Sequence, residues 1–173
     1  TAIARSLIEG GAPLELRGVL EGTAARLAAE RGVSADHLAQ ARSILHQIDA
    51  LFLVQSFDME AYSNFNTQFH HLLAQLSQSA VLIREIDRIT ALPFASPSAF
   101  LDDQSRQAEL VKTLSAAQGQ HRALIEAIEA REGFRAESLA REHARAARRN
   151  VEFLLSHEAA PREGVQSLAI LSS

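Results

Sequence analysis

Three of the seven histidines in this 173-residue chain lie next to apolar or small residues, where a buried side chain is expected. His70 directly follows a phenylalanine, His121 precedes a run of apolar residues, and His143 lies among alanines. A neutral imidazole is the most common protein ligand for zinc and similar cations. If the three side chains converge, they can hold a divalent cation and leave coordination positions open for another ligand.

Asn66 lies four residues before His70, which places the two side chains about one turn apart on the same face of a helix. Its amide oxygen would add a neutral oxygen ligand to the three imidazoles. A set made only of neutral ligands leaves the charge of the cation uncompensated. Such a centre would attract an anionic ligand, for example a carboxylate.

A second interpretation of the same residues stays open. A single histidine on an apolar helix face is more often a hydrogen-bonded core residue than a metal ligand. Helical spacing alone does not show that three helices bring their histidines together. The other histidines point elsewhere: His71 is rotated by about 100° from its neighbour, and His37, His46 and His157 lie on polar faces or at helix ends.

The elements that must position these residues are helices. Ala, Leu, Glu, Arg and Gln, which all favour helices, are abundant, and only four prolines and eight glycines occur. Apolar periodicity and capping residues predict helices over residues 13–30, 35–54, 59–76, 80–92, 103–130 and 135–155. Gly119 could divide the fifth into two. We therefore predict an all-α fold, an antiparallel bundle of six to seven helices.

Composition and charge exclude several function classes. The chain has no cysteine, which rules out disulfides, thiolate metal sites and a cysteine nucleophile. The net charge is −4, and the basic cluster of the last helix is interrupted by glutamates, so the chain is not expected to grip DNA by itself. A signal peptide and an apolar run long enough to cross a membrane are both missing from the sequence. We expect a cytoplasmic protein without a membrane partner.

Four segments resemble, in this order, the signatures of a known family. They are the first-helix segment 14–30 with its Glu15-Leu16-Arg17, the segment Asn66-Thr67-Gln68-Phe69-His70, the segment His121-Arg122-Ala123-Leu124-Ile125-Glu126-Ala127-Ile128, and His143. Together they extend over nearly the whole chain, from about residue 12 to residue 156. The chain resembles the effector-binding FCD domain of GntR-type bacterial transcription regulators of the FadR-like group.

The resemblance implies a helical bundle around a central cavity for metal and ligand. In metal-binding members, one Asp or Asn and three histidines hold a divalent cation, and the matching positions here are Asn66, His70, His121 and His143. Such ligands suit zinc first, and also nickel, cobalt or manganese. Many members have Asp where this chain has Asn66. The amide removes one negative charge, which weakens cation binding and favours an anionic effector.

The resemblance also implies that the effector is a small organic acid, such as a sugar acid, a hydroxy acid or a dicarboxylate. Arg17 matches the arginine of the first-helix signature, and a guanidinium offers a two-pronged donor to a carboxylate. Alternatively, Arg17 pairs with Glu21 on an exposed face. Asn150, two turns after His143 on the same face, is a further candidate for an effector contact.

These inferences predict the sensing domain of a transcription regulator. Residues 1–11 are interpreted as a linker remnant, 12–157 as the effector domain and 158–173 as an irregular tail. The winged helix-turn-helix domain of the family is absent from the chain, so we expect a fragment rather than a natural regulator without a DNA-binding domain. We expect a homodimer that contacts DNA only through that absent domain.

Two rival functions remain. A metal-dependent hydrolase would also use three histidines with an open position, but the sequence has no His-Glu-x-x-His motif and no carboxylate placed directly after a ligand histidine. We therefore do not expect an enzyme. A plain helical interaction module with structural histidines would require the four family-like segments to be coincidental.

Overall fold

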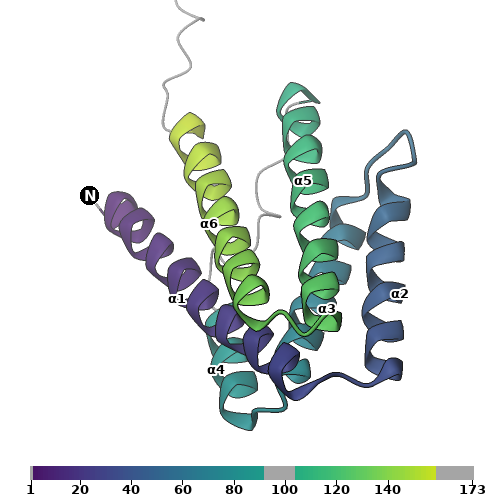
Figure 1. The fold of residues 1–173 in the computed structure, drawn as a ribbon. Helices are drawn as coiled ribbons and strands as arrows, with labels where there is room; N and C mark the ends of the chain where they lie inside the picture. The colour runs from purple at the N-terminus through teal and green to yellow at the C-terminus, as the bar shows by residue number, and fades with distance from the viewer. Residues whose placement is uncertain (1, 92–103, 159–173) are drawn as a thin grey trace, which may run out of the picture.

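The computed structural model describes the backbone of residues 2–91 and 104–158, and the side chains of residues 12–91 and 108–150. Within those ranges the chain forms six α-helices and no strand (Figure 1). They are α1 (Ala2–Arg31), α2 (Ala35–Leu51), α3 (Met59–Leu76), α4 (Ala80–Thr90), α5 (Gln104–Glu129) and α6 (Gly133–Glu158). The predicted all-α bundle is confirmed.

Local signals in the sequence account for most helix ends. The side chains of Ser34 and Asp58, which directly precede the second and third predicted helices, accept hydrogen bonds from backbone N–H groups three residues later. Ser79 caps α4 in the same way. Gly32 follows the last residue of α1 with a φ of 86°, the left-handed backbone that glycine adopts without strain.

Two predicted boundaries in the first half are wrong. The first helix begins at Ala2 rather than at Pro13, which lies inside it. Proline removes one backbone hydrogen bond, and the helix continues through Gly10, Gly11 and Pro13 into the strong helix formers Leu14 to Arg17. The second helix ends at Leu51 rather than at Val54, because Phe52 turns away and packs 5.1 Å from the ring of Phe57.

The second half contains similar differences. Gly119 does not divide α5, which is continuous through it; the position is exposed, and an added Cβ would meet no heavy atom within 4 Å. The last helix begins at Gly133, two residues earlier than predicted, and extends to Glu158. The fourth helix ends at Thr90, two residues earlier than predicted, and residues 92–103 lie outside the described residues. The predicted irregular tail lies outside them too, apart from the helical Glu158.

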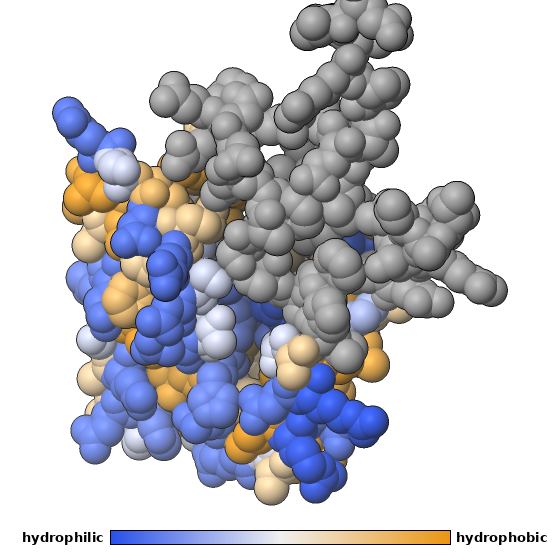
Figure 2. All heavy atoms as spheres, turned by 180° about the vertical axis from the view of Figure 1, so that it is seen from behind, coloured by the Kyte–Doolittle hydropathy of each residue, from blue (hydrophilic) through white to orange (hydrophobic). Residues whose placement is uncertain are grey.

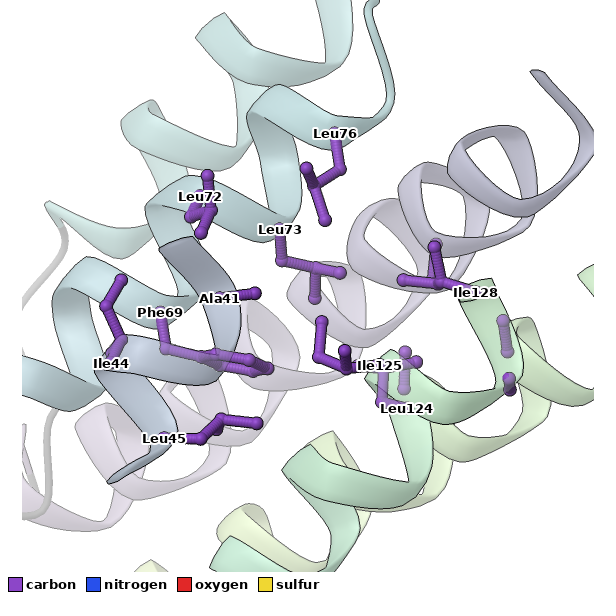
Figure 3. Packing of buried hydrophobic residues seen from close by; sticks show 14 of the residues in the cluster. Ala41, Ile44, Leu45, Phe69, Leu72, Leu73, Leu76, Leu124, Ile125 and Ile128 are labelled. Carbon is purple, nitrogen blue, oxygen red and sulfur yellow. The ribbon is translucent and has the colours of Figure 1, made fainter. Parts of the chain in front are cut away.

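The main hydrophobic core lies where α2, α3 and α5 meet (Figure 3). Helix α3 contributes Phe69, the largest fully buried side chain of the core, and its neighbours come from the facing sides of α2 and α5. The labelled members are Ala41, Ile44, Leu45, Phe69, Leu72, Leu73, Leu76, Leu124, Ile125 and Ile128. This packing fixes α3 against α5 next to their histidines.

Helices α1 and α6 pack directly against each other (Figure 1). The contact depends on Gly18, where an added Cβ would lie 2.7 Å from Cβ of Ala144. Only a glycine lets the two backbones approach this closely. Because Ala144 follows His143, the contact places that histidine beside α1.

The outer surface is predominantly hydrophilic on the face shown in Figure 2, where hydrophobic residues form small separate patches among the described residues. None of the described helices combines the length and the apolar character needed to cross a membrane. The apolar side chains therefore face mainly the interior of the bundle.

Candidate metal centre

The structure brings three histidines from three helices into one buried cluster. His70 lies on α3, His121 on α5 and His143 on α6, and all three are buried. Each offers one ring nitrogen, and these nitrogens lie within 4.8 Å of one another. The closest contact that joins two of the rings is 3.1 Å, between Nε2 of His121 and Nε2 of His143. The three side chains form a group that could hold a metal ion.

Aromatic packing supports this cluster from the core side. The ring of Phe69 lies 4.4 Å from the ring of His121, and the ring of His70 stacks at 5.2 Å on that of His143. Phe69 is itself fully buried in the hydrophobic core. The three imidazoles are therefore held in place by packing as well as by hydrogen bonds.

Gln118 fixes the protonation pattern of His121. Its Nε2 donates to the backbone oxygen of Leu45 at 2.9 Å and to Oδ1 of Asp49 at 2.7 Å. These two acceptors orient the amide, so that its Oε1 faces Nδ1 of His121 at 3.0 Å. Nδ1 must then carry the proton and donate it. In the neutral ring, Nε2 of His121 is left with a free lone pair.

Oε1 of Gln120 lies 3.0 Å from Nδ1 of His143, and in this orientation it accepts the Nδ1 proton of that ring. The two Nε2 atoms are 3.1 Å apart, and with Gln118 and Gln120 in these orientations each of them carries a lone pair. Two opposed lone pairs repel unless a cation lies between them. Two nitrogen ligands of one tetrahedral zinc ion, each about 2.05 Å from the metal, lie about 3.3 Å apart. The donor pair thus fits such an ion.

His70 has its Nε2 engaged by a different group. Nη2 of Arg17 donates to this atom at 2.8 Å, so the ring proton lies on Nδ1. Nδ1 is 3.0 Å from Oε1 of Glu21, although the two atoms are not aligned as a hydrogen bond. Arg17 also donates from Nε to Oε1 of Glu21 at 2.8 Å. Arg17, Glu21 and His70 form a buried triad at the edge of the cluster, in which the ion pair of Arg17 and Glu21 contacts a histidine.

The electrostatic environment keeps the imidazoles neutral. Burial and the nearby His143 hold the pKa of His121 well below its usual value. Burial and the nearby His70 lower the pKa of His143 to about 3. Burial and the charge of Arg17 also lower the pKa of His70, and Glu21 opposes them. Neutral imidazoles are the form that binds metal, so the three rings are ready as ligands at neutral pH.

Glu21 stays ionised in the same environment. Burial would raise the pKa of its carboxyl, but the guanidinium of Arg17 and then His70 together hold that pKa well below its usual range. A carboxylate behind a ligand histidine is a frequent arrangement at metal centres, because it orients the ring and increases its basicity. Glu21 stands in that position relative to His70.

Two cavities adjoin the cluster. The first, of about 200 Å³, lies between α1, α3, α5 and α6, and the second, of about 300 Å³, lies between α1, α3 and α4. Arg17, Asn66 and His70 line both of them. His143 and Asn150 line the first only. Each cavity offers space for a small ligand next to the histidines.

The sequence-predicted site residues thus have different positions. His70, His121 and His143 converge, whereas Asn66 and Asn150 line cavities beside them. Arg17 does pair with Glu21, but the expected exposed face is wrong, because both side chains are buried against α3.

Sequence reasoning assigned no role to Gln118 or Gln120. A signal existed for Gln118, which shares the buried stripe of α5 with Leu114 and His121. A polar residue on such a stripe usually has a buried partner. Nothing in the spacing identifies that partner as a residue on another helix.

Comparisons with known proteins identify the family of the chain. The FCD domain matches residues 13–146, which is more than half of the chain. The Glc operon transcriptional activators from two strains of Escherichia coli are 27% identical to it over 138 residues. That match covers 80% of this chain and 53% of each activator, so the chain spans about half the length of these curated relatives. The chain belongs to the FCD domain family of GntR-type transcription regulators.

Proposed function

We propose that this domain senses a small organic acid through a divalent metal ion held by its three buried histidines. The observation that carries the proposal is the 3.1 Å contact between Nε2 of His121 and Nε2 of His143. With the amide oxygens of Gln118 and Gln120 3.0 Å from the two Nδ1 atoms, both rings carry the proton on Nδ1 and a lone pair on Nε2. A buried cation would remove the repulsion between the two lone pairs, whereas an empty core would leave it.

The metal ligands in this proposal are His70, His121 and His143, with the amide oxygen of Asn66 as a fourth. Asn66 lines both cavities with His70 and lies one helical turn before it. Zinc suits these ligands best, and nickel, cobalt or manganese would also be accepted. A bound cation would supply a positive charge that attracts a carboxylate and polarises it.

The acid would occupy the cavity of about 200 Å³ that His143 lines, which limits it to a small molecule. Arg17 offers a guanidinium there, and Asn150 an amide. Tyr62 lines the same cavity, and burial raises the pKa of its hydroxyl, so that this group stays a hydrogen-bond donor. The arrangement favours an acid with a second polar group, such as a hydroxy acid.

The position of the nearest carboxylate, that of Glu21, favours regulation over catalysis. A hydrolase would need a general base within reach of a bound water. Glu21 is buried, is bonded to Arg17 and lies behind His70 rather than beside an open cavity. The relatives named above are transcriptional activators, which agrees with a sensing role.

The test is metal analysis of the purified protein followed by thermal melting with a panel of acids that includes acetate, glycolate, lactate, malonate and succinate. We expect one bound cation per chain, and stabilisation by at least one acid that disappears when a chelator removes the metal. His121→Ala should abolish both effects. His71→Ala is the matched control, because this neighbouring histidine is half-exposed and pairs with Asp87 instead. Equal behaviour of the two variants would refute the proposal, and turnover of an acid would favour an enzyme.

In the whole regulator, we propose that a separate domain contacts DNA, that the protein acts in the cytoplasm, and that two copies associate to match a two-fold symmetric operator. Exposed apolar side chains on α1 and α4, Leu16, Val19 and Val81, are candidates for contact between copies. Light scattering of the purified domain measures its mass in solution, and a monomer at all concentrations would contradict the dimer.

A further inference from the structure

Two of the buried hydrogen bonds of Arg17 differ in one respect. Its Nε donates to Glu21 and its Nη2 donates to Nε2 of His70, each at 2.8 Å. A carboxylate oxygen can accept several hydrogen bonds, but an imidazole nitrogen has a single lone pair. Nε2 of His70 can therefore accept the hydrogen bond from Arg17 or bind a cation, and it cannot do both.

We propose that Arg17 competes with the cation for His70, and that the carboxylate of the effector is the acceptor that takes over Nη2 when the cation binds. The inference rests on the proposed function, because it assumes that metal and acid meet at this centre. It adds a coupling between the two ligands that acts through one side chain.

The exchange requires only a local movement. The bond from Nε of Arg17 to Glu21 uses a different nitrogen and can persist while Nη2 changes its acceptor. Arg17 also lines both cavities, so there is space for the guanidinium to turn to either side of His70. On the side of α5 and α6 it would face the cavity proposed for the acid.

The energetic consequence is cooperativity. A buried charged donor that loses its acceptor costs free energy, because water does not replace the lost bond. Cation binding alone would remove the His70 acceptor from Nη2, whereas a carboxylate beside it would supply a new one. Acid binding alone would have to break the bond between Arg17 and His70. By linkage, each ligand then increases the affinity of the other by the same factor.

Arg17→Lys separates this competition from simple charge repulsion. Lysine keeps the positive charge and can still pair with Glu21, but its side chain ends one bond short of Nη2. We expect the metal-free Arg17→Lys protein to bind Zn²⁺ at least about tenfold more tightly than wild-type protein, because breaking a buried bond to a charged donor costs that much or more. The measurement is competition with a zinc-chelating dye in the absence of any carboxylate buffer.

Arg26→Lys is the matched control, since Arg26 lies on the same helix and forms ion pairs with Glu30 and Glu137. Its zinc affinity should equal that of wild-type protein. If Arg17→Lys does not fold, the double variant Arg17→Met/Glu21→Gln is tested instead, because it removes both charges of the buried pair. The protein to compare it with is the single variant Glu21→Gln. The double variant should bind zinc more tightly.

The possible results distinguish a failure of the competition at His70 from a failure of the proposed sensing function. Zinc binding that requires His121 but is equal or weaker in Arg17→Lys would overturn the competition and leave the sensing function intact. If no variant binds zinc in a way that depends on His121, the proposed function and the inference are both overturned. Tighter binding in Arg17→Lys but not in Arg26→Lys supports the competition.

Discussion

Gln118→Met tests whether the hydrogen bonds of Gln118 orient His121 in the candidate metal centre. Methionine has nearly the length of glutamine and fills the same buried space without polar atoms. The change removes the bonds to Leu45 O, to Asp49 Oδ1 and from Nδ1 of His121. Asp49 keeps its ion pair with Arg122, so the group left without a partner is the buried Nδ1–H of His121.

An unpaired buried donor of this kind costs about 1–3 kcal/mol, and we expect the metal-free variant to lose that free energy of unfolding in urea. Zinc affinity should fall by about 10- to 100-fold, because Nε2 of His121 is no longer held as the unprotonated nitrogen. Gln120→Met should have a smaller effect, since this half-buried glutamine can be replaced by water. Gln47→Met is the control, as Gln47 is exposed and donates to Ser43 O within its own helix. An unchanged zinc affinity in Gln118→Met would refute the reasoning.

Three further predictions concern charge, packing and pH. Asn66→Asp adds a negative charge beside His70 and should tighten zinc binding by about tenfold or more while weakening stabilisation by acids, as measured by dye competition and thermal melting. Gly18→Ala places a Cβ 2.7 Å from that of Ala144 and should lower the free energy of unfolding in urea by about 1–3 kcal/mol. Gly119→Ala has open space around the added Cβ and should raise the free energy of unfolding by about 0.5–1 kcal/mol. Equal effects of the two glycine variants would contradict the close packing of α1 on α6. For pH, the pKa of His143 is about 3 in the folded protein against 6.5 for an unperturbed histidine, so between these values the unfolded chain binds a proton that the folded chain does not. The free energy of unfolding of chelator-treated protein should therefore fall as the pH drops below about 6.5. This histidine contributes up to about 1.4 kcal/mol per pH unit. Urea unfolding of His143→Gln should show a shallower dependence on pH.

The sequence was sufficient for the helices and for the histidines because both depend on local periodicity. Asp58 and the apolar stripe that contains Phe69 define α3 without any knowledge of its neighbours. The ligand set followed from ordered motifs that resemble a family, since spacing within one helix does not reveal what another helix brings to it. Convergence of His121 with His143 is a property of the packing of α5 on α6.

The supporting residues were less predictable for the same reason. The pair Arg17 and Glu21 is visible as an i, i+4 spacing, which usually indicates an exposed ion pair. Its burial results from the close approach of α6 at Gly18 and from His70 on α3. The role of Gln118 depends on two acceptors on α2 that lie 69 and 73 residues away in sequence. No local pattern encodes such partners.

A sensor requires that ligand binding favour one arrangement of the bundle over another. The histidine cluster is connected to the rest of the fold through Gln118, which bonds the end of α2, and through Arg17, which belongs to α1. Of these two connections, Gln118 keeps its partners whether or not a cation is bound, because it contacts the Nδ1 side of His121. Arg17 contacts Nε2 of His70, and in the proposed competition it changes its partner when a cation binds there. Helix α1 is continuous from Ala2 to Arg31, so a displacement at Arg17 acts on an element that extends well beyond the centre. A signal that leaves this centre would therefore travel along α1 rather than through α2, and hydrogen exchange along α1, with and without zinc, would detect it.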